Sequence, residues 1–273
     1  MRFSIDRRLM LLTLPVLAAC SSMEGASAPP TADAYAGKSV LDAAIDAAGG
    51  EAALSQVKEL NWTGAATVTA AGKTTEIEME TIVRPFTYAR STSWPKAEGR
   101  KAARRTQIEY GKAWSIARQS WDPMPEAQSQ HEVQQFALYG VMLLTALKDP
   151  AANVQETAPG KDGTRNLHVE HSSAPPTDLR FDASGKLIRA ASSVRDPAGG
   201  AAPVAQVAEF SGEMVSNGVK WPKRITIKQN DQPYMDMELA TFEARSSNSI
   251  VPMPQSLAQP GGGPPPDDDE EPQ

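Results

Sequence analysis

The chain has 273 residues and a formal net charge of −6 at pH 7, from 27 basic and 33 acidic side chains. This length suffices for one large domain or two small ones, and the lack of a basic cluster argues against a nucleic-acid partner. A single cysteine excludes an intrachain disulfide. Beyond the first twenty residues, the longest uncharged apolar run is Phe136–Leu147, which is too short to span a bilayer.

The first twenty residues have the order of features of a secretory signal. Three arginines precede an apolar run over residues 9–17, and small residues then lead to Cys20. The run is too short for a bilayer-spanning helix, so we interpret residues 1–19 as a signal peptide. Leu17-Ala18-Ala19-Cys20 resembles a bacterial lipobox, which implies lipid attachment at Cys20 and a new N-terminus there. An ordinary secretory signal with a chance cysteine is the alternative.

A flexible segment and two short helices are expected next. Residues 20–38 are mostly small or polar, which is typical of a tether, and we expect the folded domain over 39–252. Ser39 is a candidate N-cap. Apolar residues at helical spacing over 41–48 predict a helix that ends at Gly49-Gly50, with one or two helical turns over 51–57.

From Leu60 the hydrophobic period changes to two, which predicts strands with one apolar and one polar face. Glycine-containing turns separate the expected strands, which lie at about 60–68, 77–83, 86–93, 106–110 and 113–118. Pro123 and Pro125 then introduce the one long helix, at about 127–147, whose second half is apolar on almost all sides. Such a helix is buried on most sides or lies in apolar surroundings.

More strands follow, at about 154–157, 166–171, 178–181, 187–194, 204–215, 223–229 and 234–244. Residues 253–273 are rich in proline, glycine and acid without periodicity, which predicts a disordered tail. We expect about ten or eleven of these segments to form strands, in a mainly β, α+β domain. A large antiparallel sheet must curl or close to cover its apolar face, and the uncharged helix is the natural element for it to curl around.

Three blocks resemble the LolA/LolB-like periplasmic superfamily. Ala47-Ala48-Gly49-Gly50, followed by Leu54, Val57, Leu60 and Gly64, is similar to its opening. Asn217-Gly218-Val219-Lys220-Trp221-Pro222 is similar to its closing segment, and Val83-Arg84-Pro85 to a third position. The resemblance implies an unclosed antiparallel half-barrel whose helices plug the concave side. It also implies a cavity that binds acyl chains of lipids or lipoproteins.

Arg84 has two alternative roles, one implied by the resemblance and the other by the alternation of side chains along its strand. In LolA carriers an arginine before proline holds the helical lid shut, and Arg84 matches that position. Strict alternation from Ile77, however, places Arg84 on the face of Glu76, Glu78 and Glu80, unless a bulge precedes Pro85. Arg84 therefore either holds the lid or pairs with those glutamates at the surface.

Apolar residues on three elements are the remaining ligand-binding candidates. Methionine adapts to varied apolar shapes, which suits a lipid cavity, although it also fills ordinary cores. The candidates occupy shared strand faces and the uncharged helix: Ile77, Met79, Phe136, Met142, Met235 and Met237. The implied lipid anchor resembles that of LolB-like receptors. Ser21 follows Cys20, and in the usual sorting rule only Asp there retains a lipoprotein at the inner membrane. We therefore expect an anchor in the outer membrane of a Gram-negative bacterium, with the domain in the periplasm.

No catalytic constellation was found, so we expect no enzyme, cofactor or metal site. His168 and His171 are three apart on an expected strand, so they point to opposite faces. Neither a Gly-x-Ser-x-Gly elbow nor a His-Glu-x-x-His motif occurs. The favoured function is acyl-chain binding. The alternatives are a structural or interaction module with a filled core that docks an envelope protein, and a hydrolase, which would need a polar pocket with a nucleophile and a base.

Overall fold

The structure, a computed structural model, describes residues 34–70, 72–117 and 120–249. The predicted signal peptide, Cys20 and the predicted tail over 253–273 lie outside these residues. No helix in the described ranges has the length and hydropathy needed to cross a bilayer.

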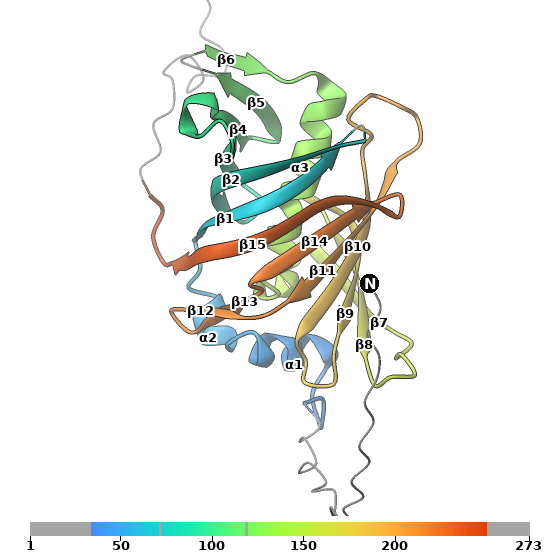
Figure 1. The fold of residues 1–273 in the computed structure, drawn as a ribbon. Helices are drawn as coiled ribbons and strands as arrows, with labels where there is room; N and C mark the ends of the chain where they lie inside the picture. Colours follow the sequence, from blue (N-terminus) through green and yellow to red (C-terminus); the bar gives the residue numbers. More distant parts are fainter. Residues whose placement is uncertain (1–33, 71, 118–119, 250–273) are drawn as a thin grey trace, which may run out of the picture. The chain divides into compact units, whose positions relative to one another are not determined.

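Within the described residues, thirteen strands form one antiparallel sheet in the order β6-β5-β4-β3-β2-β1-β15-β14-β11-β10-β9-β8-β7 (Figure 1). The first half contains β1 (Glu59–Ala70), β2 (Lys73–Arg84), β3 (Tyr88–Pro95), β4 (Arg104–Glu109), β5 (Lys112–Ala117) and β6 (Ser120–Pro123). The second half contains β7 (Ala152–Thr157), β8 (Arg165–His171), β9 (Ala174–Phe181), β10 (Leu187–Val194), β11 (Val204–Ser211), β14 (Arg224–Gln229) and β15 (Gln232–Arg245). A separate hairpin contains β12 (Met214–Ser216) and β13 (Val219–Trp221).

The predicted fold class, an α+β unclosed antiparallel half-barrel, is confirmed, because β6 and β7 are edges that do not pair with each other. The predicted number of strands, ten or eleven, was too low. The sequence missed β6 because its prolines were interpreted as the start of a helix, whereas an edge strand tolerates Pro123. It merged most of β12 with β11 in one strand over 204–215, and it missed β13, which is too short to show periodicity.

The long helix α3 (Glu126–Val141) connects the two edges of the sheet, from β6 to β7. It packs against β2, β5, β9 and β10, and Figure 1 shows it behind the sheet. The helix ends at Val141, six residues before the predicted end at Leu147. Leu144 has a positive φ of 58°, and a 3₁₀ turn over Thr145–Lys148 follows. The apolar run over 136–147 is therefore a helix followed by buried turns.

Two short helices, α1 (Val40–Ala47) and α2 (Glu51–Leu54), open the domain as predicted. The Ser39 hydroxyl accepts a hydrogen bond from the Asp42 backbone N–H at 3.0 Å, which confirms the predicted N-cap. Tyr35 is buried, and its hydroxyl donates to the Asp182 carbonyl at 2.6 Å. Residues 34–38, which the sequence placed in the flexible tether, therefore already contact the domain.

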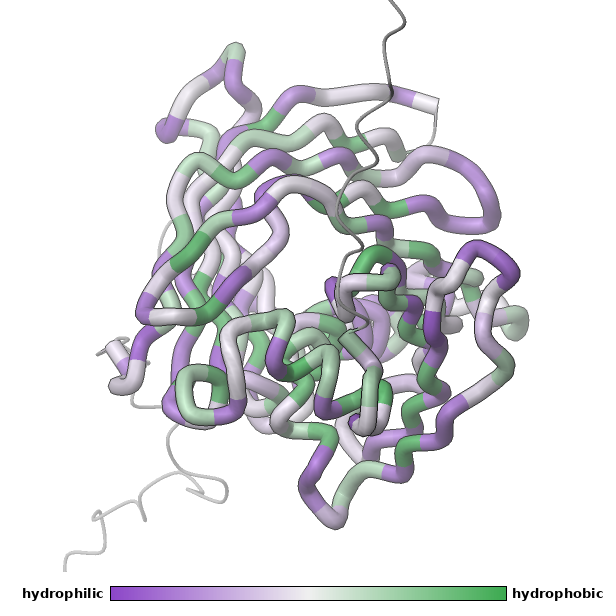
Figure 2. The backbone as a smooth tube through the Cα atoms, turned by 90° about the horizontal axis from the view of Figure 1, so that it is seen from below, coloured by the Kyte–Doolittle hydropathy of each residue, from purple (hydrophilic) through white to green (hydrophobic). Residues whose placement is uncertain are grey.

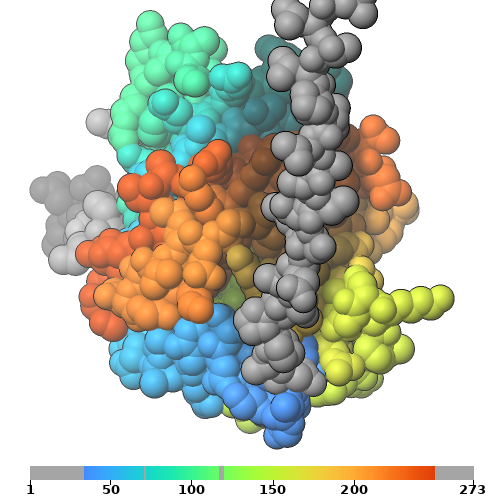
Figure 3. All heavy atoms as spheres, turned by 60° about the horizontal axis from the view of Figure 1, so that its bottom comes forward, coloured from blue at the N-terminus to red at the C-terminus, as the bar shows by residue number. Residues whose placement is uncertain are grey.

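The opening and closing blocks of the family resemblance lie side by side. The Lys220 backbone N–H donates to the Ala48 carbonyl at 2.8 Å. A Cβ built on Gly49 would lie 2.0 Å from the Gly218 carbonyl oxygen, so only glycine allows this approach. Figure 3 shows the first helices (blue) against the orange β12–β13 region. Blocks about 170 residues apart in the sequence thus form one contact.

The concave face of the sheet has a filled part and an unfilled part. Hydrophobic and hydrophilic residues alternate along the strands, as Figure 2 shows. Beneath β8–β11 the core is closely packed, and its largest fully buried side chains include Ile45, Leu144, Leu167, Leu179 and Phe181. Between α3 and β1–β4, β14 and β15 a space remains.

Candidate functional site

The unfilled space is a cavity of about 170 Å³ between α3 and the strands from β14 to β4. This volume is of the order of an engineered apolar cavity, roughly 150 Å³, that holds a benzene molecule. One part of the wall is apolar: Trp62, Val68, Ile77, Met79, Phe136, Leu138, Tyr139, Ile227, Met235 and Met237. The other part is polar: Thr81, Ser91, Ser93, Thr106, Glu132, Gln135 and Tyr234.

Five of the predicted ligand-binding residues line this cavity together: Ile77, Met79, Phe136, Met235 and Met237. The strand register brings them together, because β1 lies between β2 and β15. Ala66 is opposite both Ile77 and Met237, and Gly64 is opposite Met79. Ile77, Met235 and Phe136 are only half-buried, so the protein leaves part of their apolar surface uncovered.

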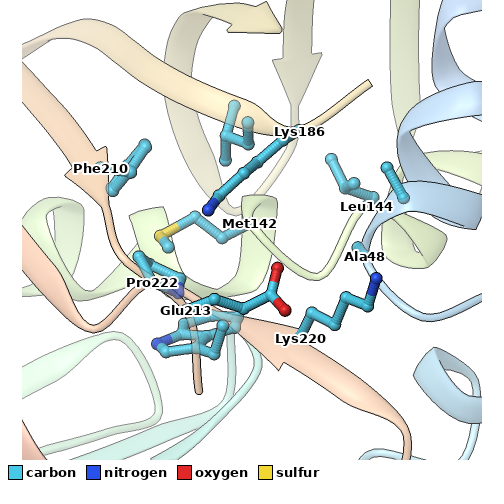
Figure 4. A pocket seen from close by; sticks show the side chains of 11 residues that line it. Ala48, Met142, Leu144, Lys186, Phe210, Glu213, Lys220 and Pro222 are labelled. Atoms are coloured by element: carbon cyan, nitrogen blue, oxygen red, sulfur yellow. The ribbon is translucent and has the colours of Figure 1, made fainter. Parts of the chain in front are cut away.

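Met142, the sixth apolar candidate, lies elsewhere, because α3 ends immediately before it. It lines a small pocket of about 40 Å³ near the end of α1, shown in Figure 4. Leu144 and Phe210 also line this pocket, with the charged side chains of Lys186, Glu213 and Lys220 around it. The pocket is too small for more than a water-sized group, so Met142 mainly fills space there.

Among the described residues, no hydrogen bond or ion pair joins Arg84 to the long helix or to the glutamates of its own strand. No bulge interrupts the pairing of β2 with β1 or β3, so Arg84 stays on the Glu76, Glu78 and Glu80 face, as alternation predicted. Its Nε donates to Glu59 Oε2 at 3.1 Å, and its Nη2 donates to the Ser249 carbonyl at 2.6 Å. In the structure, Arg84 thus joins the start of β1 to the end of the described chain.

Glu59 is fully buried at the centre of this cluster. Ser249 donates to its carboxylate from both the hydroxyl, at 2.6 Å, and the backbone N–H, at 3.0 Å. Burial acts to raise the pKa of Glu59, but the bonds from Ser249 and Arg84 outweigh it and hold that pKa below its ordinary value. The carboxylate therefore stays charged at neutral pH and fixes the chain end to β1.

Replacing Arg84 with methionine is expected to lower the free energy of unfolding by about 2 kcal/mol, because the buried Glu59 carboxylate loses its nearest cation. One fifth of the Arg84 side chain is exposed, so the loss is smaller than for a fully buried pair. Urea unfolding measures it. Arg224→Met removes an exposed pair with Asp236 and should cost clearly less. Unchanged stability with altered ligand uptake would instead support the lid role for Arg84.

Phe86, rather than Arg84, connects the β2–β3 turn to the long helix. The sequence placed Phe86 in a strand, but it lies in the turn with a positive φ of 58°. Its ring faces Gly140 so closely that a Cβ there would lie 2.7 Å from it. The ring also stacks on His171, with centroids 4.1 Å apart. The turn after Arg84-Pro85 is thus packed against α3.

The sequence reasoning missed the polar wall, and Glu132 in particular. Glu132 lies four residues before Phe136 on α3, so both point to the same side of the helix. The sequence contained one signal for this, namely a charged residue at helical spacing from the apolar residues that face the cavity. Ser91, Ser93 and Thr106 gave none, because hydroxyl side chains are equally common on solvent-facing strand positions.

The histidines form no shared site. His168 bonds Asp178 Oδ1 at 2.7 Å, whereas His171 stacks on Phe86. No group of three or more His, Cys, Asp or Glu side chains placed to hold a metal ion occurs in the described ranges.

The described residues form an unclosed antiparallel half-barrel with a long helix on its concave side and a cavity beneath that helix. This is the fold that the resemblance implied. No protein-family model and no curated protein sequence matches the chain.

Among solved structures, the chain is similar to a DUF1329 family protein from Desulfovibrio piger, at 10% identity and a TM-score of 0.52, over 81% of this chain and 100% of that one. It is also similar to a LolA superfamily protein from Nitrosomonas europaea, at 12% identity and a TM-score of 0.48, over 76% of this chain and 96% of that one. At these identities the likeness concerns the fold alone.

Proposed function

We propose that this chain is a lipoprotein, anchored through Cys20 in the outer membrane, whose periplasmic domain binds acyl chains of lipids or lipoproteins. The cavity supports this proposal most directly. Ile77, Met79, Phe136, Met235 and Met237 present apolar surface to a space that no side chain of the described residues fills. Each methylene buried there contributes roughly 0.8 kcal/mol, so a short stretch of chain suffices for binding without any covalent step.

The anchor and the compartment rest on the sequence. Lipid attachment at Cys20 would hold the protein stably if more than one acyl chain is added, because a single chain gives only marginal binding. The interaction module with a filled core, the alternative from the sequence, explains the packed region beneath β8–β11. It does not explain why the apolar wall beneath α3 is left uncovered.

Filling the cavity is expected to abolish acyl-chain binding. Ser93 faces the cavity from β3, so Ser93→Phe places a ring within about 170 Å³ of space. We expect its affinity for the neutral probe 1,6-diphenylhexatriene to fall by about tenfold or more. Probe fluorescence measures this in the full chain carrying Cys20→Ser, and native mass spectrometry shows whether lipid co-purifies.

Thr92→Phe is the matched control, because the neighbouring residue on β3 points to the opposite face of the sheet, where it accepts from Arg105 Nε at 3.2 Å. It should bind the probe as the parent chain does. If the parent chain neither carries lipid nor binds the probe, the acyl-binding function is wrong. A protein partner recovered by crosslinking would then favour the interaction module.

A further inference from the structure

Glu132 places an unpaired carboxylate in the wall of the cavity. It lies on α3 one turn before Phe136 and is the one charged residue among those that line the cavity in the described chain. No hydrogen bond or ion pair within the described residues reaches its carboxylate. Gln135, one turn further along the same helix, is by contrast bonded to the buried Gln206 through its Nε2, at 3.2 Å.

Among the described residues that line the cavity, none supplies a positive charge near Glu132. Tyr139 and Tyr234 are the other titratable residues of the wall, and neither is cationic. Glu132 is half-buried, its carboxylate has no partner among the described residues, and burial raises the pKa of Glu132 to about 7. A bound molecule that supplies a charged donor would remove this penalty, whereas a second carboxylate would increase it.

Hydroxyl groups in the wall of the cavity offer further acceptors for a charged donor that pairs with Glu132. Thr81 Oγ1 and Ser91 Oγ lie 3.0 Å apart and share one hydrogen bond, which leaves acceptor lone pairs on both oxygens. Thr106 lies beside Ser91 in the strand register and lines the same cavity. A primary ammonium has three N–H donors, so one carboxylate and two hydroxyl oxygens could satisfy it.

We propose that the cavity selects amphiphiles with a protonated primary amine, whose chain lies against Met79, Phe136 and Met237 while the ammonium group pairs with Glu132. The inference rests on the proposed function and narrows its ligand class from acyl chains in general to amine-bearing ones. The recognition is non-covalent: the ammonium exchanges water for the carboxylate and the hydroxyls, and the chain exchanges water for the apolar wall.

Three probes with the same twelve-carbon chain test the proposal: dodecylamine, dodecanol and dodecanoate. Isothermal titration calorimetry at pH 8, with the full chain carrying Cys20→Ser, measures their affinities below the concentrations at which they form micelles. We expect dodecylamine to bind about tenfold more tightly than dodecanol, and dodecanoate to bind most weakly. In Glu132→Gln the advantage of the amine over the alcohol should fall to about twofold or less.

Glu126→Gln is the matched control, because Glu126 is an exposed carboxylate in the first turn of the same helix. It should keep the preference for the amine. Equal binding of all three probes, or an amine preference that survives in Glu132→Gln, would overturn the amine inference and leave the acyl-binding function intact. Binding of none of the three would overturn both. Circular dichroism of Glu132→Gln verifies that the variant is folded.

Discussion

Alanine at Gly49 is expected to lower the free energy of unfolding by about 4 kcal/mol, which is enough to unfold a domain of ordinary stability at moderate temperature. The new Cβ would lie 2.0 Å from the Gly218 carbonyl oxygen, which is backbone and cannot rotate away. The φ of Gly49, +124°, is also strained for any residue with a side chain. Both effects oppose the contact between the opening and closing blocks.

Gly50→Ala separates the two effects. Gly50 also has a positive φ, of +91°, but a Cβ there meets no atom beyond its chain neighbours within 4 Å. We expect it to lose only about 1–2 kcal/mol, from backbone strain alone. Urea unfolding followed by circular dichroism measures both variants. Equal losses would mean that the β12–β13 hairpin moves aside easily, and that the contact with Gly218 does not hold the domain together.

The contact at Gly49 illustrates what the sequence could predict and what it could not. The family resemblance singled out Gly49 and Gly218, and the residue types explain why each backbone bends there. That the two glycines touch follows from the pairing of β15 with β1, which joins the two halves of the chain. No local pattern encodes a pairing of such long range, so the contact appears only in the structure.

The cavity also shows which features could be predicted from the sequence and which could not. Period-two alternation correctly assigned Ile77, Met79, Met235 and Met237 to one face of their strands, because side-chain direction is a local property. Met142 was placed wrongly relative to them, since its position depended on where α3 ends. The predicted end at Leu147 comes later than the real end, which lies where Gly140 meets Phe86 and Leu144 adopts a positive φ.

The second large effect is expected from Glu132, whose unpaired carboxylate makes the stability of the protein depend on pH. Glu132→Gln is expected to be more stable than the parent chain at pH 8, by as much as about 3 kcal/mol. Burial raises the pKa of Glu132 in the folded state from its ordinary 4.5 to about 7. As the pH rises through this window the unfolded chain loses its proton first, so the parent chain loses stability between about pH 4.5 and 7. Glutamine cannot ionise, so the variant keeps that stability.

The other titratable groups that face Glu132 leave this window undisturbed. Burial raises the pKa values of Tyr139 and Tyr234 above their ordinary value, so both stay neutral up to pH 8. Urea unfolding at pH 5, 6, 7 and 8 should therefore show a difference between Glu132→Gln and the parent chain that grows with pH. Glu126→Gln, at an exposed position of the same helix, is the control. A difference between Glu132→Gln and the parent chain that does not grow with pH would mean that water already solvates the Glu132 carboxylate.

Ligand addition connects this stability effect to the amine inference. Dodecylamine at a saturating concentration should reduce the loss of stability between pH 5 and 8 in the parent chain, because the paired ammonium favours the charged carboxylate in the folded state. Dodecanol should stabilise the parent chain equally at every pH, since it gains from apolar burial alone. If both ligands leave the slope of stability against pH unchanged, the amine does not reach Glu132, whatever its affinity for the cavity.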